Sequence, residues 1–148
     1  KNHTLEAPLG HIPLHIRGGY ILPTQEPGYT IHESRQNPFG LIVALDQAGK
    51  AQGKLYLDDG ESEQVDSSLY VDFVANNGKL IASPVGEYEV NQTLANVTIL
   101  GVDSKPKSVS FNHHKNITFT YENSTIFITN LEKETYKGAF VDPFTISW

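Results

Sequence analysis

An alternation of apolar and polar residues with a period of two constrains the fold of this chain more than any other feature of its sequence. Successive side chains of a β-strand point to opposite faces of the sheet, so a half-buried strand alternates in polarity. One further segment, 40–46, is apolar on both faces, which is typical of a strand covered on both sides. The alternation predicts strands within residues 11–17, 53–59, 68–75, 95–100, 116–122, 125–130 and 144–148.

The segments between these strands agree with an all-β chain. Clusters of Gly, Asn, Asp and Pro separate the short strands at the spacing expected of a β-sandwich. No stretch has the periodicity of an amphipathic helix of useful length. The 148 residues favour one domain with its own core over two complete domains. We therefore predict an all-β fold, an antiparallel β-sandwich.

A boundary is predicted between Gly28 and Pro38. The stretch LPTQEPGYTIHESRQNPFG contains three prolines and no sustained alternation. It separates residues 1–30 from residues 31–148. The first block contains only one or two predicted strands, too few to fold alone. We therefore expect its apolar residues to be covered by the second block or by a partner chain.

Composition excludes several classes of function. The net charge is -6 and the basic residues are scattered, which disfavours nucleic acid and anionic membranes as partners. No apolar run approaches the roughly 20 residues of a membrane span. The absence of cysteine excludes disulfides, thiolate metal sites and thiol nucleophiles. The absence of methionine leads us to expect that Lys1 is a processed or engineered terminus.

Five Asn-x-Ser/Thr sequons predict glycosylation and passage through the secretory pathway. A chance match in a β-protein rich in Thr and Asn remains the alternative. In the predicted strands the acceptor side chains fall on the face opposite the apolar residues, so they are expected to face water. The predicted acceptors are Asn2, Asn91, Asn96, Asn116 and Asn123.

The stretch LYLDDGESEQV, residues 55–65, contains the most suggestive cluster of acids. Glycosidases use two carboxylates at defined separations, about 5 Å in retaining enzymes. Asp58 and Asp59 are adjacent in a strand and so point to opposite faces, which disfavours joint catalysis. The spacing also differs from that of a calcium-binding EF-hand loop. Asp-Gly supplies the backbone conformation of a tight turn, so we predict a strand-ending turn.

Other candidate site residues are weaker. His11 and His15 share a strand face but lie about 13 Å apart if extended, too far to bind one metal ion together. His113 and His114 fall in a predicted exposed turn. The chain has no Gly-x-Ser-x-Gly motif and no Gly-rich phosphate loop. From the residues alone we predict no catalytic residue, no cofactor and no metal site.

Exposed tyrosines offer one binding alternative. Tyr70, Tyr88 and Tyr136 could form a platform on which sugars stack, although scattered tyrosines on a sandwich more often pack or lie on the surface.

Several segments resemble the C-terminal region of the α-glucosidases of glycoside hydrolase family 31, which include lysosomal acid α-glucosidase, sucrase-isomaltase and maltase-glucoamylase. They occur in the family's order, cover most of the chain and are densest over residues 11–62. The segments are HIPLHIRGGYILPTQEP, ESRQNPFGLIVALDQAGKAQGKLYLDDGES, NVTILGVDSKPKSV and the final FTISW.

The resemblance implies a catalytic (β/α)₈ barrel followed by a proximal and a distal β-sandwich domain. Residues 1–30 resemble the last strands of the proximal domain, and residues 31–148 resemble the distal domain. The family's catalytic aspartates lie in barrel motifs of the type Trp-x-Asp-Met-Asn-Glu, which this sequence lacks; its single tryptophan is Trp148. None of the family's catalytic positions can therefore be assigned to this chain.

The resemblance leads to a first hypothesis of a non-catalytic C-terminal subunit or proteolytic fragment of a secreted, extracellular or vacuolar-lysosomal α-glucosidase. The expected partner is a larger catalytic barrel chain from the same precursor, which binds the α-glucoside substrate. The alternative is a free carbohydrate-binding or cell-surface β-sandwich module. Its motivation is the all-β pattern together with the sequons and the exposed tyrosines.

Overall fold

The computed structural model describes residues 4–113 and 115–148, and nearly all of its regular structure is β, which confirms the predicted fold class. Two short helical turns accompany the strands, α1 (Ile31–Gln36) and the 3-10 turn η1 (Leu131–Lys133). The strands are β1 (Tyr20–Gln25), β2 (Phe39–Ala44), β3 (Ala51–Leu57), β4 (Leu69–Asn76), β5 (Lys79–Gly86), β6 (Leu94–Leu100), β7 (Val109–Phe111), β8 (Lys115–Ile117), β9 (Phe119–Glu122), β10 (Thr125–Ile128) and β11 (Phe144–Ser147).

These strands form one sheet, in the order β8-β7-β11-β5-β4-β3-β1-β2-β6-β10-β9. Most neighbours are antiparallel, as predicted, but β1 runs parallel to β3 and β2 runs parallel to β6. Alternation could not reveal the parallel pairs, because the side-chain period is the same in parallel and antiparallel strands.

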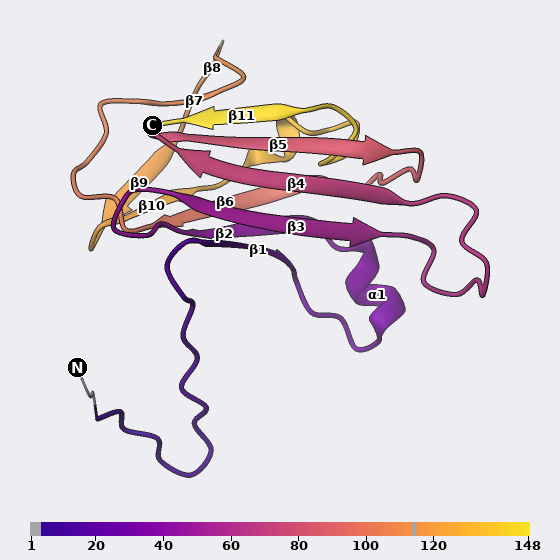
Figure 1. Cartoon of the computed structure of the whole chain (residues 1–148), viewed down its shortest axis with the longest axis horizontal. Helices are drawn as coiled ribbons and strands as arrows, with labels where there is room; N and C mark the ends of the chain where they lie inside the picture. The colour runs from indigo at the N-terminus through magenta and orange to yellow at the C-terminus, as the bar shows by residue number, and fades with distance from the viewer. Residues whose placement is uncertain (1–3, 114) are drawn as a thin grey trace.

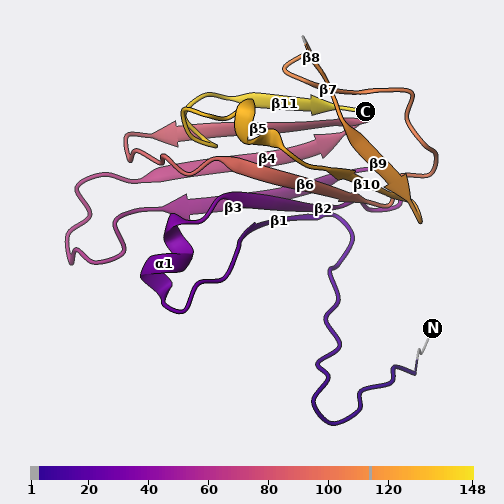
Figure 2. The same cartoon turned by 180° about the vertical axis from the view of Figure 1, so that it is seen from behind.

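The sheet curls into two facing layers. In Figure 1, β3, β4, β5 and β11 lie in front of β2, β6, β9 and β10, and Figure 2 shows the second layer from the opposite side. The two edge strands, β8 and β9, are separated along the chain only by Thr118. A single residue thus connects opposite ends of the strand order, which brings the sheet close to a closed barrel and limits its exposed edges.

The core lies between the layers and follows the alternation. Along β4, Val71 and Phe73 are each 1% exposed, while Tyr70, which precedes Val71 and points to the outer face, is 58% exposed. The ring of Phe140 lies 5.8 Å from that of Phe73 and 5.0 Å from that of Phe39 on β2. Phe140 therefore packs against both layers. Along β2, all residues but the half-buried Ile42 are buried, in keeping with the apolar run on both faces.

Helix α1 lies within the stretch where the sequence shows no alternation. Its N-cap, Thr30, accepts a hydrogen bond from the backbone N–H of Glu33 at 3.1 Å, and Pro38 follows its C-cap. The helix has six residues and buries none of them, so it is too short to show an apolar stripe. Among the described residues, no helix is long and apolar enough to cross a membrane.

The strand predicted over residues 11–17 is wrong. This segment belongs to the N-terminal arm, defined here as residues 4–17, which contains no strand and extends away from the sheet (Figure 1). Its apolar side chains are exposed, 80% at Ile12 and 86% at Leu14. A strand requires a neighbour for its backbone hydrogen bonds, and the described residues supply none to this segment.

Strand pairing continues across the boundary predicted at residue 30. All six residues of β1 pair with β2, and Tyr20 also pairs with Gln52 of β3. β1 is therefore part of the same sheet as the strands that follow the boundary. The assignment of residues 1–30 and 31–148 to proximal and distal domains stays a prediction.

Candidate functional site

The acidic stretch forms the turn that its sequence predicted. Asp58 Oδ1 accepts a hydrogen bond from the backbone N–H of Gly60 at 2.8 Å. Asp59 Oδ1 accepts from the backbone N–H groups of Glu61 and Ser62, each at 3.1 Å, and the Ser62 hydroxyl donates to Asp59 Oδ2. Gly60 has a φ of 71°, the left-handed conformation that favours glycine. Both carboxylates therefore stabilise the loop that leaves β3.

Electrostatics also argues against Asp59 as a catalytic acid. Hydrogen bonds from the Ser62 hydroxyl, and then from the backbone N–H groups of Glu61 and Ser62, lower the pKa of Asp59 below its ordinary value. A glycosidase acid that protonates the leaving group needs a raised pKa, so that it carries a proton at the working pH. Asp59 instead stays ionised, in keeping with a structural role.

Arg35 connects this turn to α1. Its guanidinium group donates a hydrogen bond from Nη2 to the backbone carbonyl of Asp58. Gln25 of β1 holds the same C-terminal end of the helix, since its side-chain amide donates to the carbonyl of the C-cap, Asn37, at 2.9 Å. The turn, the helix and the ends of β1 and β3 thus form one hydrogen-bonded corner of the sheet, which Figure 1 shows around α1.

The histidines and the acids do not gather into a metal site within residues 4–113 and 115–148. His11 and His15 are exposed on the N-terminal arm, and His113 is exposed with a φ of 61° in the turn after β7. His114 lies outside the described residues.

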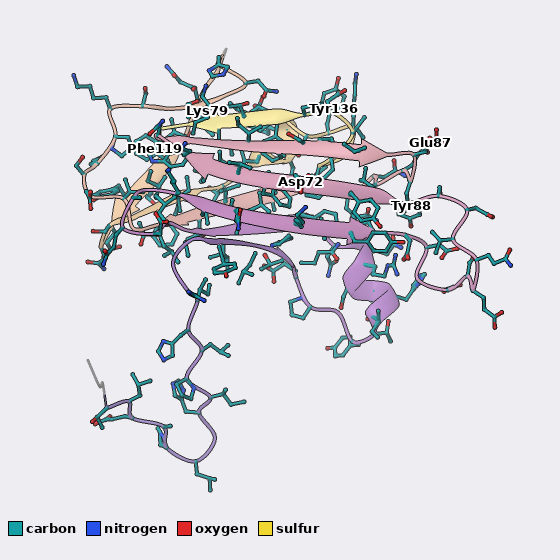
Figure 3. All side chains as sticks on the ribbon, viewed as in Figure 1. Asp72, Lys79, Glu87, Tyr88, Phe119 and Tyr136 are labelled. Carbon is teal, nitrogen blue, oxygen red and sulfur yellow. The ribbon has the colours of Figure 1, made fainter. Side chains whose placement is uncertain are left out.

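The three tyrosines singled out in the sequence occupy different surroundings. Tyr70 is exposed on the outer face of β4, whereas Tyr88 is half-buried against the core. Tyr136 is 71% exposed, with the Lys137 ammonium 5.9 Å from the centre of its ring. Tyr88 and Tyr136 are labelled at separate places in Figure 3, so these residues do not form one platform.

Sequence reasoning missed the partner of Tyr70. Tyr56 of β3 pairs directly with Tyr70 across the two strands, and the ring centres are 4.8 Å apart. The signal was present, since Tyr56 alternates with the apolar Leu55 and Leu57, but the sequence does not give the register that joins the two rings.

The described sequons differ in exposure. Asn91 and Asn116 are exposed, and Asn123 is exposed with a φ of 48° at the hairpin turn between β9 and β10. Asn96 is only half-buried on the outer side of β6, where Val97 and Ile99 face the core as predicted. Asn2 lies outside the described residues. Glycosylation of these asparagines stays a prediction.

No family model matches the chain. It is 66% identical over 148 residues to a glucoamylase 1 of Candida albicans, covering 100% of this chain and 16% of that protein. It is 49% identical over 149 residues to an α-glucosidase of Schizosaccharomyces pombe, covering 99% of this chain and 15% of that protein. It is 39% identical over 141 residues to a probable maltase-glucoamylase 2 of Homo sapiens, covering 89% of this chain and 5% of that protein. The chain thus spans at most 16% of the length of these relatives.

Solved structures share the fold. A glucosidase II alpha subunit matches with a TM-score of 0.73 and 22% identity, over 97% of this chain and 18% of that one. A dextranase of Flavobacterium johnsoniae matches with a TM-score of 0.59 and 18% identity, over 97% of this chain and 21% of that one. At these identities the likeness establishes the β-fold alone.

Proposed function

Because the chain is the counterpart of a C-terminal segment of glycoside hydrolase family 31 α-glucosidases, we propose that it is the non-catalytic C-terminal part of such an enzyme. In this proposal the whole enzyme releases terminal, non-reducing α-linked glucose from oligosaccharides with retention, through a covalent glycosyl intermediate. The chemistry and the α-glucoside pocket belong to a catalytic (β/α)₈ barrel outside these 148 residues.

One observation carries the proposed partnership, the exposed N-terminal arm. Leu5, Leu9, Ile12 and Leu14 are between 55% and 107% exposed, although they occur in close succession. A run of exposed apolar side chains marks a surface that another polypeptide covers. In the proposal this polypeptide is the β-domain that precedes the sheet and adjoins the barrel, and the arm completes it.

A second part of the molecule supports docking beside the arm. Tyr29 is 103% exposed and Ile31 is 82% exposed, both at the start of α1. Figure 1 shows α1 and the N-terminal arm on the same side of the sheet, below β1. Both segments therefore lie on the same side of the sheet, as expected if one neighbouring domain contacts them together.

Passage through the secretory pathway is part of the proposal. It is motivated by the five sequons, of which Asn91, Asn116 and Asn123 are exposed and accessible to a glycan in the folded sheet. Intact-mass measurement of the native protein before and after removal of N-glycans tests this. An unchanged mass would contradict it.

The partnership is tested by expressing this chain together with a second chain, the part of the enzyme that contains the barrel and precedes Lys1 in the proposed precursor. Co-purification of the two chains and hydrolysis of maltose are measured. We expect the unmodified pair to co-purify and to hydrolyse maltose. The double variant Ile12→Asp with Leu14→Asp should not co-purify, because it places two charges in an apolar contact. The control Tyr136→Asp places a charge at an exposed position of the sheet domain and should leave assembly intact. Full assembly of the double variant would contradict the role of the arm.

A free carbohydrate-binding module is the second candidate. The exposed Tyr56–Tyr70 pair is the observation that favours sugar binding. The two candidates differ in the state of the native protein. A free module migrates as a single chain of about the 16.4 kDa of these residues plus any glycans, whereas the first proposal requires a large companion or a longer chain.

A further inference from the structure

The outer face of β3 and β4 presents consecutive cross-strand pairs of distinct chemistry. Lys54 lies opposite Asp72, and two residues further along Tyr56 lies opposite Tyr70. Residues i and i+2 of a strand share a face, so Asp58 continues the same side beyond Tyr56, and Ser68 precedes Tyr70 on it. Figure 3 labels Asp72 in the middle of this face. An aromatic pair is thus flanked by polar groups at both ends.

The aromatic pair is open to solvent. Tyr56 is 44% exposed and Tyr70 is 58% exposed, and their rings are tilted by 55°. Val85 of β5, directly opposite Tyr70, is 69% exposed and widens the apolar area. Aromatic rings that pack against each other while exposed to solvent form a rigid contact surface, which loses little conformational entropy on binding.

The flanking groups supply both donors and acceptors. Lys54 Nζ lies 3.1 Å from Asp72 Oδ1, so the charges of this pair neutralise each other while both side chains remain exposed. At the other end, the Tyr56 hydroxyl interacts with the side chains of Asp58 and Ser68. Partial desolvation, followed by the Asp58 carboxylate, raises the pKa of Tyr56 above its ordinary value.

This combination matches the chemistry of a neutral sugar. A pyranose ring has apolar C–H faces and a rim of hydroxyls that donate and accept hydrogen bonds. The Lys54–Asp72 pair offers no unbalanced charge, and the Asp58 carboxylate at the other end disfavours an anionic ligand while it can accept hydrogen bonds from sugar hydroxyls. The aromatic surface is narrow and bordered by polar residues on both ends, unlike the broad apolar core of a stable protein interface.

We propose that Tyr56 and Tyr70 form the centre of a binding site for α-glucan chains, separate from the catalytic pocket. This rests on the proposed function, which supplies the identity of the sugar: an enzyme that acts on α-glucosides benefits from holding a long chain at a second point. Each ring offers its exposed face to the apolar side of a glucose unit, while Lys54 and Asp72 at one end and Asp58 at the other hydrogen-bond to hydroxyls. Bivalent attachment of a polymer raises its local concentration at the enzyme.

The test is native gel electrophoresis of the full-length enzyme through gels containing increasing soluble starch, with saturating deoxynojirimycin to occupy the catalytic pocket. We expect the starch to retard the unmodified enzyme. The double variant Tyr56→Val with Tyr70→Val keeps residues with high strand propensity and removes both rings. Its apparent Kd for starch should rise about tenfold, equivalent to about 1.4 kcal/mol. The control Tyr136→Val removes an exposed tyrosine elsewhere and should be retarded like the unmodified enzyme.

A second variant distinguishes loss of sugar binding from a folding defect. Tyr56→Phe with Tyr70→Phe keeps the rings and should retain retardation to within about threefold, since stacking supplies most of the contact. Absence of retardation of the unmodified enzyme, or unchanged retardation of the valine variant, would overturn the proposal. So would a valine variant that loses its companion domain, because that indicates a protein interface. Failure of the proposed function appears separately, as an unmodified protein that does not hydrolyse maltose.

Discussion

The N-terminal arm and strand β4 have similar sequence patterns and opposite structures. In β4, Val71 and Phe73 alternate with polar residues and are each 1% exposed. In the arm, Ile12 and Leu14 alternate in the same way and are 80% and 86% exposed. Alternation therefore indicates that a segment can be a strand, but burial requires a neighbouring strand on the same chain or on another one.

Strand β1 has the paired neighbouring strand that the arm lacks among the described residues. It follows the arm after the turn at Gly18 and Gly19, and its Ile21 is only 2% exposed, because β2 pairs with β1 along all six residues. The change from arm to strand thus occurs where the chain meets the sheet, within the block that the sequence predicted to need a partner.

The largest loss of stability is expected for Phe140→Ala. Its ring packs against Phe39 and Phe73 from the two layers, so truncation leaves a cavity between them. We expect the free energy of unfolding to fall by about 3–5 kcal/mol, measured by urea denaturation. Phe127→Ala, at a position 41% exposed, should cost about 1 kcal/mol or less. Equal losses for the two variants would contradict a core centred on Phe140.

Gly60→Ala should cost less, about 2–3 kcal/mol, because two effects add. A side chain at a φ of 71° is strained by about 1–2 kcal/mol. The added Cβ would also displace the Arg35 guanidinium and remove its hydrogen bond to Asp58, worth about 1 kcal/mol. Gly49→Ala is the matched control, since Gly49 has a φ of 68° but open space around it. A difference of zero between the two variants would contradict a stabilising contact by Arg35.

Replacement of Asp58 and Asp59 by asparagine should affect stability or assembly more than turnover. Both carboxylates accept hydrogen bonds within the turn, and the proposed catalytic pocket lies in another domain. The measurement is kcat for maltose in the assembled enzyme, together with its melting temperature. A large loss of kcat in a variant of unchanged stability and assembly would overturn the structural role.

The pH dependence of stability should show the charge of Asp59. Its pKa in the folded state is lowered, so its contribution is fully present above the unfolded pKa of about 4 and is lost as the pH falls through the folded value. The Asp59→Asn variant lacks this titration. The stability difference between the two proteins should therefore be constant near neutrality and shrink as the pH falls below about 4, measured by denaturation between pH 7 and pH 2. A stability difference between the two proteins that is the same at pH 7 and at pH 2 would contradict the lowered pKa of Asp59.

The smallest effect on the sheet itself is expected from the arm. Ile12→Asp with Leu14→Asp should change the free energy of unfolding of the isolated chain by no more than about 0.5 kcal/mol, because neither side chain is buried by the described residues. Thermal unfolding of the chain without its partner measures this. A clear destabilisation would show that the arm packs on its own sheet.

The sequence predicted most strands and their inward faces, and it predicted the Asp-Gly turn, because both depend on local chemistry. It missed α1, whose six residues bury nothing and whose N-terminus is set by the Thr30 cap. It also missed Tyr56 as the partner of Tyr70, because the two residues are joined only by the register of β3 and β4. Without that register, the sequence could not show which of the scattered tyrosines are neighbours in the folded sheet.

The sequence by itself determined that the chain is all-β, which residues of β4 and β6 face inward, and that Asp58 and Asp59 end a strand in a turn. Only the tertiary structure decided that β1 and β2 take parallel neighbours, and that the arm remains uncovered. The physical reason is that alternation and turn preference depend on neighbouring residues in the chain. Pairing and burial depend on which distant segment lies alongside.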